Sequence, residues 1–236
     1  MYYYGGADFG SLLYYLGIAM ALVSIALSFK VRSTYNRISQ YETARRISGA
    51  EAAQRLLRAN GIYDVTVQPI SGTLSDNYNP SNKTLNLSQA VYSGRDIAAV
   101  AVAAHECGHA IQHAENYRPI LLRSRLVPVA NLGSQAGMLL FSVGLIFGSG
   151  SSTFLMDLGI FLFSFAVLFH VVTLGVEFDA SRRALRALGN LSLLTEEEQP
   201  KASKMLRTAA YTYVAAMASA MIQLLRLVAI RNRRRN

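Results

Sequence analysis

Two long apolar runs joined by a short polar turn restrict the fold of this chain more than any other feature. No Lys or Arg occurs over residues 126–181, and the apolar runs cover residues 126–147 and 154–176. Each run is long enough as a helix to cross the ~30 Å hydrocarbon core of a bilayer. The Gly-Ser-Gly-Ser-Ser sequence between them is typical of a turn. The sequence therefore predicts a transmembrane helical hairpin over residues 126–176.

A third apolar run lies near the N-terminus. Residues 11–29 carry no charge, and the chain as a whole is 52% hydrophobic and only 16% charged, which is typical of a membrane protein. We therefore expect residues 1–30 to contain an N-terminal transmembrane helix. The basic residues follow this helix rather than precede it, so the positive-inside rule places the N-terminus outside and the next segment in the cytoplasm.

The last apolar run, residues 209–230, differs from the others because it contains an arginine. It contains Gln223 and Arg226 and is followed by a tail rich in arginine. If it crossed the membrane, five arginines would lie at or beyond the outer leaflet, against the positive-inside rule. We therefore expect residues 177–236 to be a cytoplasmic segment whose final helix is embedded in the membrane or packs on the domain.

Residues 31–125 are polar enough to form a folded cytoplasmic domain. Together with Lys30 they hold twelve of the 23 Lys and Arg residues, which suits membrane orientation better than nucleic-acid binding. A capping box from Ser48 to Glu51 opens a helix, and alternating segments near residues 65–67 and 84–88 predict a small sheet. A second capping box, from Ser93 to Asp96, is expected to start the next helix.

That next helix carries a His-Glu-x-x-His motif formed by His105, Glu106 and His109. Residues four apart share a helix face, so the two imidazoles can reach one metal ion, while Cys107 points away. This is the arrangement of a catalytic zinc, with the glutamate taking a proton from zinc-bound water. The alternative is a pair of core histidines that hydrogen-bond to carbonyl groups.

A catalytic zinc requires a third protein ligand. His113 lies ~12 Å along the helix from His105, too far for both to bind one ion. Glu177 is the strongest candidate, because it stands at the cytoplasmic end of the predicted hairpin, where a buried carboxylate needs a cation. The alternative for Glu177 is a salt bridge with Arg125 or Arg183.

Three neighbours of Glu177 on the same helix receive different interpretations. Asp179 is ~200° away around the helix and is expected to face elsewhere. Ser181 shares the face of Glu177 and is expected to hydrogen-bond a metal ligand. His170 lies two turns deeper on that face, where a hydrogen bond to a neighbouring helix suits it better than metal binding.

The sequence resembles the bacterial YugP-type neutral zinc metallopeptidases, which are similar to HtpX and the CAAX prenyl proteases. The resemblance is carried by residues 72–80 with 87–88, residues 103–113 and residues 176–185. It implies one Zn²⁺ ion held by His105, His109 and Glu177, with Glu106 as the general base. Where those relatives usually have an aspartate four residues after the ligand glutamate, this chain has Ser181.

These observations predict a mainly α integral membrane protein with a cytoplasmic α+β zinc metallopeptidase domain, a small sheet and the His-Glu-x-x-His helix. We expect a multi-pass endopeptidase of the cell membrane that cleaves membrane or membrane-proximal proteins at the cytoplasmic face, with no nucleic-acid partner. A peptide is expected to add to the strand at residues 85–88. The alternative function is a non-catalytic membrane scaffold with a structural or vestigial zinc site. Four side chains are candidates for stabilising the oxyanion: Tyr78, Arg182, Tyr211 and Tyr213.

Overall fold

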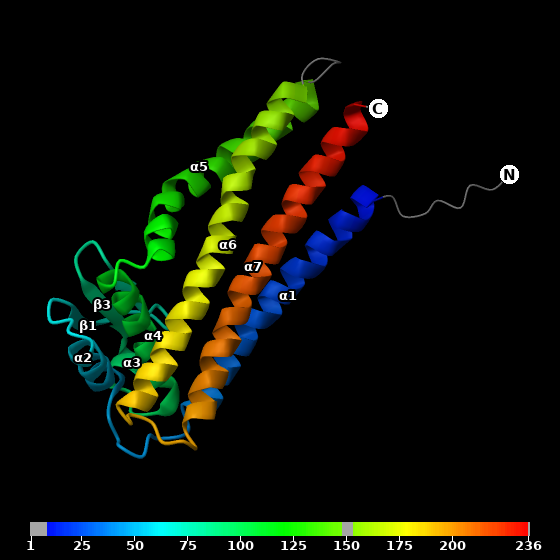
Figure 1. Ribbon diagram of the computed structural model, residues 1–236. Helices are drawn as coiled ribbons and strands as arrows, with labels where there is room; N and C mark the ends of the chain where they lie inside the picture. The colour runs from blue at the N-terminus through cyan, green and yellow to red at the C-terminus, as the bar shows by residue number, and fades with distance from the viewer. Residues whose placement is uncertain (1–8, 148–152, 236) are drawn as a thin grey trace. The chain divides into compact units, whose positions relative to one another are not determined.

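A computed structural model describes residues 9–147 and 153–235 of the chain (Figure 1). The described residues are mostly helical and include a small three-stranded sheet. The expected turn at residues 148–152 and the extreme N-terminus lie outside the described residues. In chain order the elements are α1 (Phe9–Ile38), α2 (Gly49–Ala59), β1 (Thr66–Ile70), β2 (Asn77–Asn79), β3 (Thr84–Ser88), α3 (Gln89–Ser93), α4 (Ile97–Ala114), α5 (Arg118–Phe147), α6 (Thr153–Asn190) and α7 (Gln199–Arg235).

Four of these helices, α1, α5, α6 and α7, are long and apolar enough to cross a membrane. The predicted mainly α composition, with helices long enough to cross a membrane and a small sheet, is confirmed. Helix α7 begins at Gln199, ten residues before the expected start at 209, and it meets the length and composition criteria for a membrane span.

The chain divides into two compact units, and each of the four long helices contributes to both. Unit 1 comprises Met1–Ala26, Leu122–Leu174 and Tyr213–Asn236, and unit 2 comprises Leu27–Leu121 and Gly175–Thr212. The two units differ in composition, because unit 1 consists of apolar helical segments, whereas unit 2 contains the sheet and the short helices α2, α3 and α4.

In unit 1, glycines allow α5 and α6 to run side by side in close contact (Figure 1). A Cβ atom on Gly133 would lie 2.4 Å from the carbonyl oxygen of Leu162, so only glycine fits there. The outward surface of these helices is apolar, with Leu132 67% and Phe161 60% exposed. Large exposed apolar surfaces of this kind are typical of helices that contact lipid.

The C-terminal end of α7 also belongs to unit 1. Arg231 donates two hydrogen bonds to Asp157, at 2.7 and 2.8 Å, close to the start of α6. The end of α7 therefore lies at the same end of unit 1 as the start of α6. A cytoplasmic tail and an outer turn between α5 and α6 were both expected, and this ion pair is incompatible with having both.

Unit 2 contains one of the two predicted capping boxes. At the start of α2, the Glu51 amide donates to the Ser48 hydroxyl at 3.1 Å and the Ser48 amide donates to the Glu51 carboxylate at 2.8 Å. The second capping box is wrong, because Ser93 ends α3 and the extended backbone of Gly94 separates it from α4. Asp96 alone caps α4, by accepting from the Ala99 amide at 2.9 Å.

The sheet of unit 2 has the strand order β1-β3-β2, with β1 parallel and β2 antiparallel to the central strand β3. Strands β1 and β3 were predicted, whereas β2 was missed because it is three residues long and lies in a segment rich in turn-forming residues. The expectation that a peptide adds to the strand at residues 85–88 is wrong for residues 85 and 86, because β3 is paired there with β1 on one side and with β2 on the other. The edges available for pairing belong to β1 and β2.

Candidate metal centre

Helices α4 and α6 approach each other closely at the His-Glu-x-x-His motif. A Cβ atom on Gly108 would lie 2.5 Å from the carbonyl oxygen of Ala180, so the backbones nearly touch. Around this contact α4 is buried among small residues and is part of the core of unit 2. The glycine between the two histidines therefore lets α6 bring its own side chains next to them.

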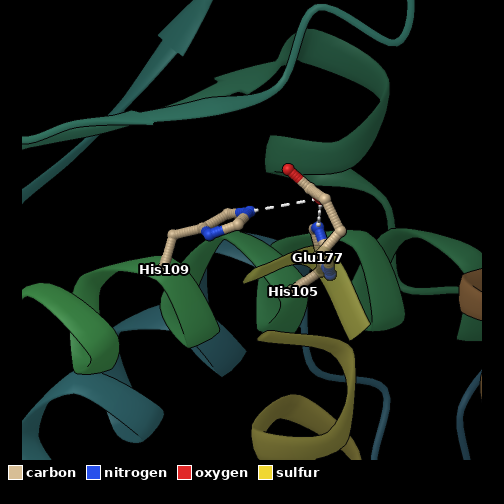
Figure 2. A group of neighbouring side chains, drawn as sticks. All are labelled: His105, His109 and Glu177. Carbon is tan, nitrogen blue, oxygen red and sulfur yellow. Dashed lines mark hydrogen bonds and ion pairs between the residues drawn. The ribbon is translucent and has the colours of Figure 1, made fainter. Parts of the chain in front are cut away.

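Both histidines point toward Glu177 (Figure 2). The Nε2 atoms of His105 and His109 lie 3.2 and 3.5 Å from Oε2 of Glu177, and the Glu177 side chain is only 2% exposed. One ligand atom from each of the three residues falls in a group whose members are within 4.8 Å of one another. The structure thus brings together the three residues that the sequence nominated.

Two of the three spacings between these atoms are close to those of a tetrahedral zinc site. With metal–ligand bonds of ~2.0–2.1 Å, neighbouring ligand atoms in a tetrahedron lie ~3.3 Å apart. The two distances from Glu177 to the imidazoles, 3.2 and 3.5 Å, bracket that value. Two histidines and one glutamate form a ligand set that is known for catalytic zinc sites, which keep the fourth position open.

The alternative partners for Glu177 were arginines. Arg183 is instead directed away, because it donates to Asp179 from Nε and to Glu115 from an η nitrogen, each at 2.5 Å. Asp179 is outside the group of converging ligand atoms. In unit 2, helix α6 therefore separates its two carboxylates, Glu177 toward the histidines and Asp179 toward Arg183.

Glu106 is buried next to the converging ligand atoms but is not one of them, with 8% of its surface exposed. Its Oε2 atom accepts a hydrogen bond from the Tyr78 amide at 3.0 Å. Burial raises the pKa of Glu106 to about 7; the charge of His105 opposes this shift, and the negative charge of Glu177 adds to it. A carboxyl group of this kind can both take and release a proton near neutral pH.

Each imidazole also makes a hydrogen bond on its far side. Ser181 Oγ lies 3.1 Å from Nδ1 of His105, the position at which Ser181 was expected to hydrogen-bond a ligand. Gln112 Oε1 lies 3.1 Å from Nδ1 of His109. Such outer contacts hold metal-binding histidines in one orientation.

Comparison with known proteins identifies the family. A family model described as "Putative neutral zinc metallopeptidase" matches residues 13–232. The chain belongs to this family. It is 43% identical over 219 residues to "Putative membrane protease YugP" of Bacillus subtilis (strain 168), an alignment that covers 93% of this chain and 96% of that protein. No solved structure matches the chain.

The predicted resemblance to this zinc metallopeptidase family is thus confirmed. The family description implies zinc, and the relative's name describes a membrane protease. Both agree with the four apolar helices and with the converging ligand atoms of this chain.

The other histidines of this metallopeptidase family member lie apart from the ligand group. His113 Nδ1 is 3.1 Å from the hydroxyl of Tyr78, and His170 is in unit 1. The thiol of Cys107 faces away from the histidines, 3.6 Å from the carbonyl oxygen of Ala53 on α2. Among the described residues, none of the three joins the group of metal-ligand atoms.

Sequence reasoning missed two residues that shape the site. Tyr78 was considered only for its side chain, but its backbone amide contacts Glu106. Gln112 stands three residues after His109, on the same helix face, and this spacing was the signal that could have identified it. Asp76 supports Tyr78 indirectly, because it accepts from the Ser88 amide at 2.7 Å and ties the segment before β2 to the end of β3.

Proposed function

We propose that this chain is a membrane-embedded zinc endopeptidase. The observation that carries the proposal is the convergence of His105, His109 and Glu177 on one point, with the buried carboxylate of Glu106 beside them. His105, His109 and Glu177 would hold the metal through Nε2, Nε2 and a carboxylate oxygen. A bound zinc ion would supply a polarised carbonyl and a water ligand of lowered pKa.

Glu106 would act as the general base in this proposal. Its carboxylate would take a proton from the attacking water and later release it to the leaving amine. The Tyr78 amide holds one oxygen of Glu106 by a hydrogen bond of 3.0 Å, so the carboxylate is held in one orientation without a charged partner. The backbone of β2 thereby positions the base.

Strand β2 is also the best candidate for binding the substrate. It is an edge strand next to α4, and because the amide of its central residue, Tyr78, donates to Glu106, a peptide would pair with the other backbone groups of this edge. An extended peptide that pairs with this edge would lie next to the proposed metal ligands. The substrates would be membrane or membrane-proximal proteins, because the chain that carries the site has four apolar helices.

We further propose that the site faces the cytoplasm. Residues 30–125 hold twelve Lys and Arg and residues 182–207 hold six, whereas the tail at residues 231–235 holds four. The positive-inside rule then favours the cytoplasm for the two longer basic segments. Because Arg231 pairs with Asp157, α7 would cross the membrane and its tail would lie outside, on the side where α6 starts.

Labelling of single cysteines in intact cells tests this topology. Ser192 and Asn232 are both exposed on the protein surface, so labelling at each depends on the side of the membrane. In a Cys107→Ala background, Ser192→Cys should be protected from an impermeant maleimide because it would lie in the cytoplasm. Asn232→Cys should react because it would lie outside. Permeabilised cells, in which both should react, provide the control. Reaction of Ser192→Cys in intact cells would reverse the proposed orientation.

Glu106→Gln tests the enzymatic proposal. The purified full chain should bind one zinc ion with or without this substitution, because Glu106 is outside the ligand group. Cleavage of a denatured membrane protein should fall about 10²- to 10⁴-fold, the usual contribution of a general base. If zinc-loaded wild type cleaves no protein, the non-catalytic scaffold replaces this proposal.

A further inference from the structure

Gln112 connects the two helices that carry the proposed metal ligands. It lies on α4, three residues after His109, and its side chain is 0% exposed. Its Oε1 atom is 3.1 Å from Nδ1 of His109. Its Nε2 atom donates to the carbonyl oxygen of Val176 and to Oδ2 of Asp179, each at 2.9 Å, and both acceptors belong to α6. Every polar atom of the Gln112 side chain is therefore in use.

The acceptors on α6 determine which way the amide of Gln112 points. A carbonyl oxygen cannot donate a hydrogen bond, and the carboxylate of Asp179 is paired with Arg183 at 2.5 Å. If the amide were flipped, its oxygen would face two acceptors and two hydrogen bonds would be lost. The nitrogen must therefore face α6, and the oxygen must face His109.

This orientation in turn determines the proton position on His109. The amide oxygen only accepts, so Nδ1 of His109 has to donate. Nδ1 of His109 is therefore protonated whatever the state of Nε2, which lies 3.5 Å from the Glu177 carboxylate. A metal ion bound at Nε2 then meets an imidazole whose remaining proton is on Nδ1. That is the tautomer that a metal ion bound at Nε2 requires.

At Nδ1, His105 lacks an equivalent constraint. Its Nδ1 atom lies 3.1 Å from the Ser181 hydroxyl, which can donate or accept. The Ser181 contact is therefore compatible with either tautomer of His105. At Nε2 both histidines face the Glu177 carboxylate, so an acceptor-only partner at Nδ1 distinguishes His109 from His105.

We propose that Gln112 is a positioning residue that keeps Nδ1 of His109 protonated and ties that histidine to the helix of Glu177 before any metal binds. The inference rests on the proposed zinc site for its purpose, but it concerns hydrogen bonds that exist in the metal-free chain. Zinc binding then requires no additional free energy to rotate His109 or to move its proton to Nδ1.

Two substitutions separate the two roles of Gln112. Gln112→Met keeps the length of the side chain but loses the acceptor for His109 and the donors to α6. Gln112→Glu keeps an acceptor for Nδ1 and loses the donors to Val176 and Asp179. Cys107→Ala is the matched control, because Cys107 is equally buried on α4 but contacts Ala53 rather than the site.

Ring ¹⁵N NMR spectra of the metal-free full chain measure the tautomer directly. The chain has only four histidines, and the His109 signals can be assigned by their loss in His109→Ala. We expect Nδ1 of His109 to be protonated in the wild type, in Cys107→Ala and in Gln112→Glu. In Gln112→Met we expect part of the population to lose the Nδ1 proton and to keep a proton only on Nε2, next to Glu177. In chelator-competition titrations, Gln112→Met should bind zinc about 10- to 100-fold more weakly than the wild type, the usual effect of losing such a contact.

The inference is overturned if Gln112→Met keeps both the wild-type tautomer and the wild-type zinc affinity. If Gln112→Met does not fold, Gln112→Glu decides, since a folded Gln112→Glu protein with a changed His109 tautomer contradicts the proposal. Failure of the wild type to bind zinc would remove the proposed function. The metal-free spectra would still test the role of Gln112.

Discussion

The two units of this chain differ in where their apolar and polar side chains lie. Unit 1 places apolar side chains on its outer surface and packs its helices through glycine contacts such as Gly133 on Leu162. Unit 2 instead buries polar side chains in its interior, including Glu106, Gln112 and Glu177. A buried carboxylate is costly unless it is paired. The buried polar groups of unit 2 therefore support the proposed cation site, because a core built only for stability would be apolar.

Helix α6 shows the same contrast within a single element. Its segment at residues 153–174 belongs to unit 1 and contains one charged residue, Asp157. Its segment at residues 175–190 belongs to unit 2 and carries Glu177, Asp179 and the hydrogen-bonding Ser181. One continuous helix can therefore serve the apolar unit along one part and the metal centre along the other.

The largest expected effects come from filling the glycine contacts of each unit. Gly108→Ala should displace α6 from α4, with a cost of about 1–3 kcal/mol for overpacking. It should also weaken zinc binding, because it changes the distance between the histidines and Glu177. Gly133→Ala should disturb the packing of unit 1 while zinc affinity stays at the wild-type value.

Cys107 provides the measurement for this comparison, because it is the single cysteine and is fully buried in unit 2. Its reaction with a thiol dye on heating reports unfolding of unit 2, and each 1 kcal/mol should lower the midpoint by about 2–4 °C for a chain of this size. Gly175→Ala is the control, since a Cβ there meets no atom within 4 Å. Equal loss of zinc affinity in Gly108→Ala and Gly133→Ala would show that the two units do not behave separately.

A smaller effect is expected from exchanging the two carboxylates that α6 carries in unit 2 for amides. Glu177→Gln should weaken zinc binding by about 10-fold or more, because it removes a charged ligand. Asp179→Asn should weaken it much less, since an amide oxygen can still accept from Gln112. Chelator competition on both variants measures the difference. If Asp179→Asn released zinc and Glu177→Gln retained it, Asp179 rather than Glu177 would be the metal ligand.

The smallest effect concerns the caps of unit 2, away from the metal centre. Ser48→Ala should cost about 1 kcal/mol, because it removes the cap that accepts from the Glu51 amide. Ser93→Ala should be close to neutral, because the cap of α4 is Asp96. Thermal reactivity of Cys107 measures both, and zinc affinity should stay unchanged. A larger loss in Ser93→Ala than in Ser48→Ala would contradict the observed caps.

Several features of the protein follow from local sequence patterns. The apolar runs predicted long helices, because hydropathy over about 20 residues depends on neither packing nor partners. The spacing of His105 and His109 placed both on one helix face, and a charge at the end of an apolar helix nominated Glu177. The Ser48 capping box was predictable because its two hydrogen bonds join residues only three apart.

The tertiary structure alone decided the features that depend on residues far apart in the chain. Strand β2 exists because β3 pairs with it, and the contact between the end of α7 and the start of α6 rests on the ion pair between Arg231 and Asp157. The orientation of the Gln112 amide depends on Val176 and Asp179, more than sixty residues away. A local pattern encodes periodicity and caps, but it does not encode which donor meets which acceptor across two helices. That pairing exists only once Gly108 has let α4 and α6 come together.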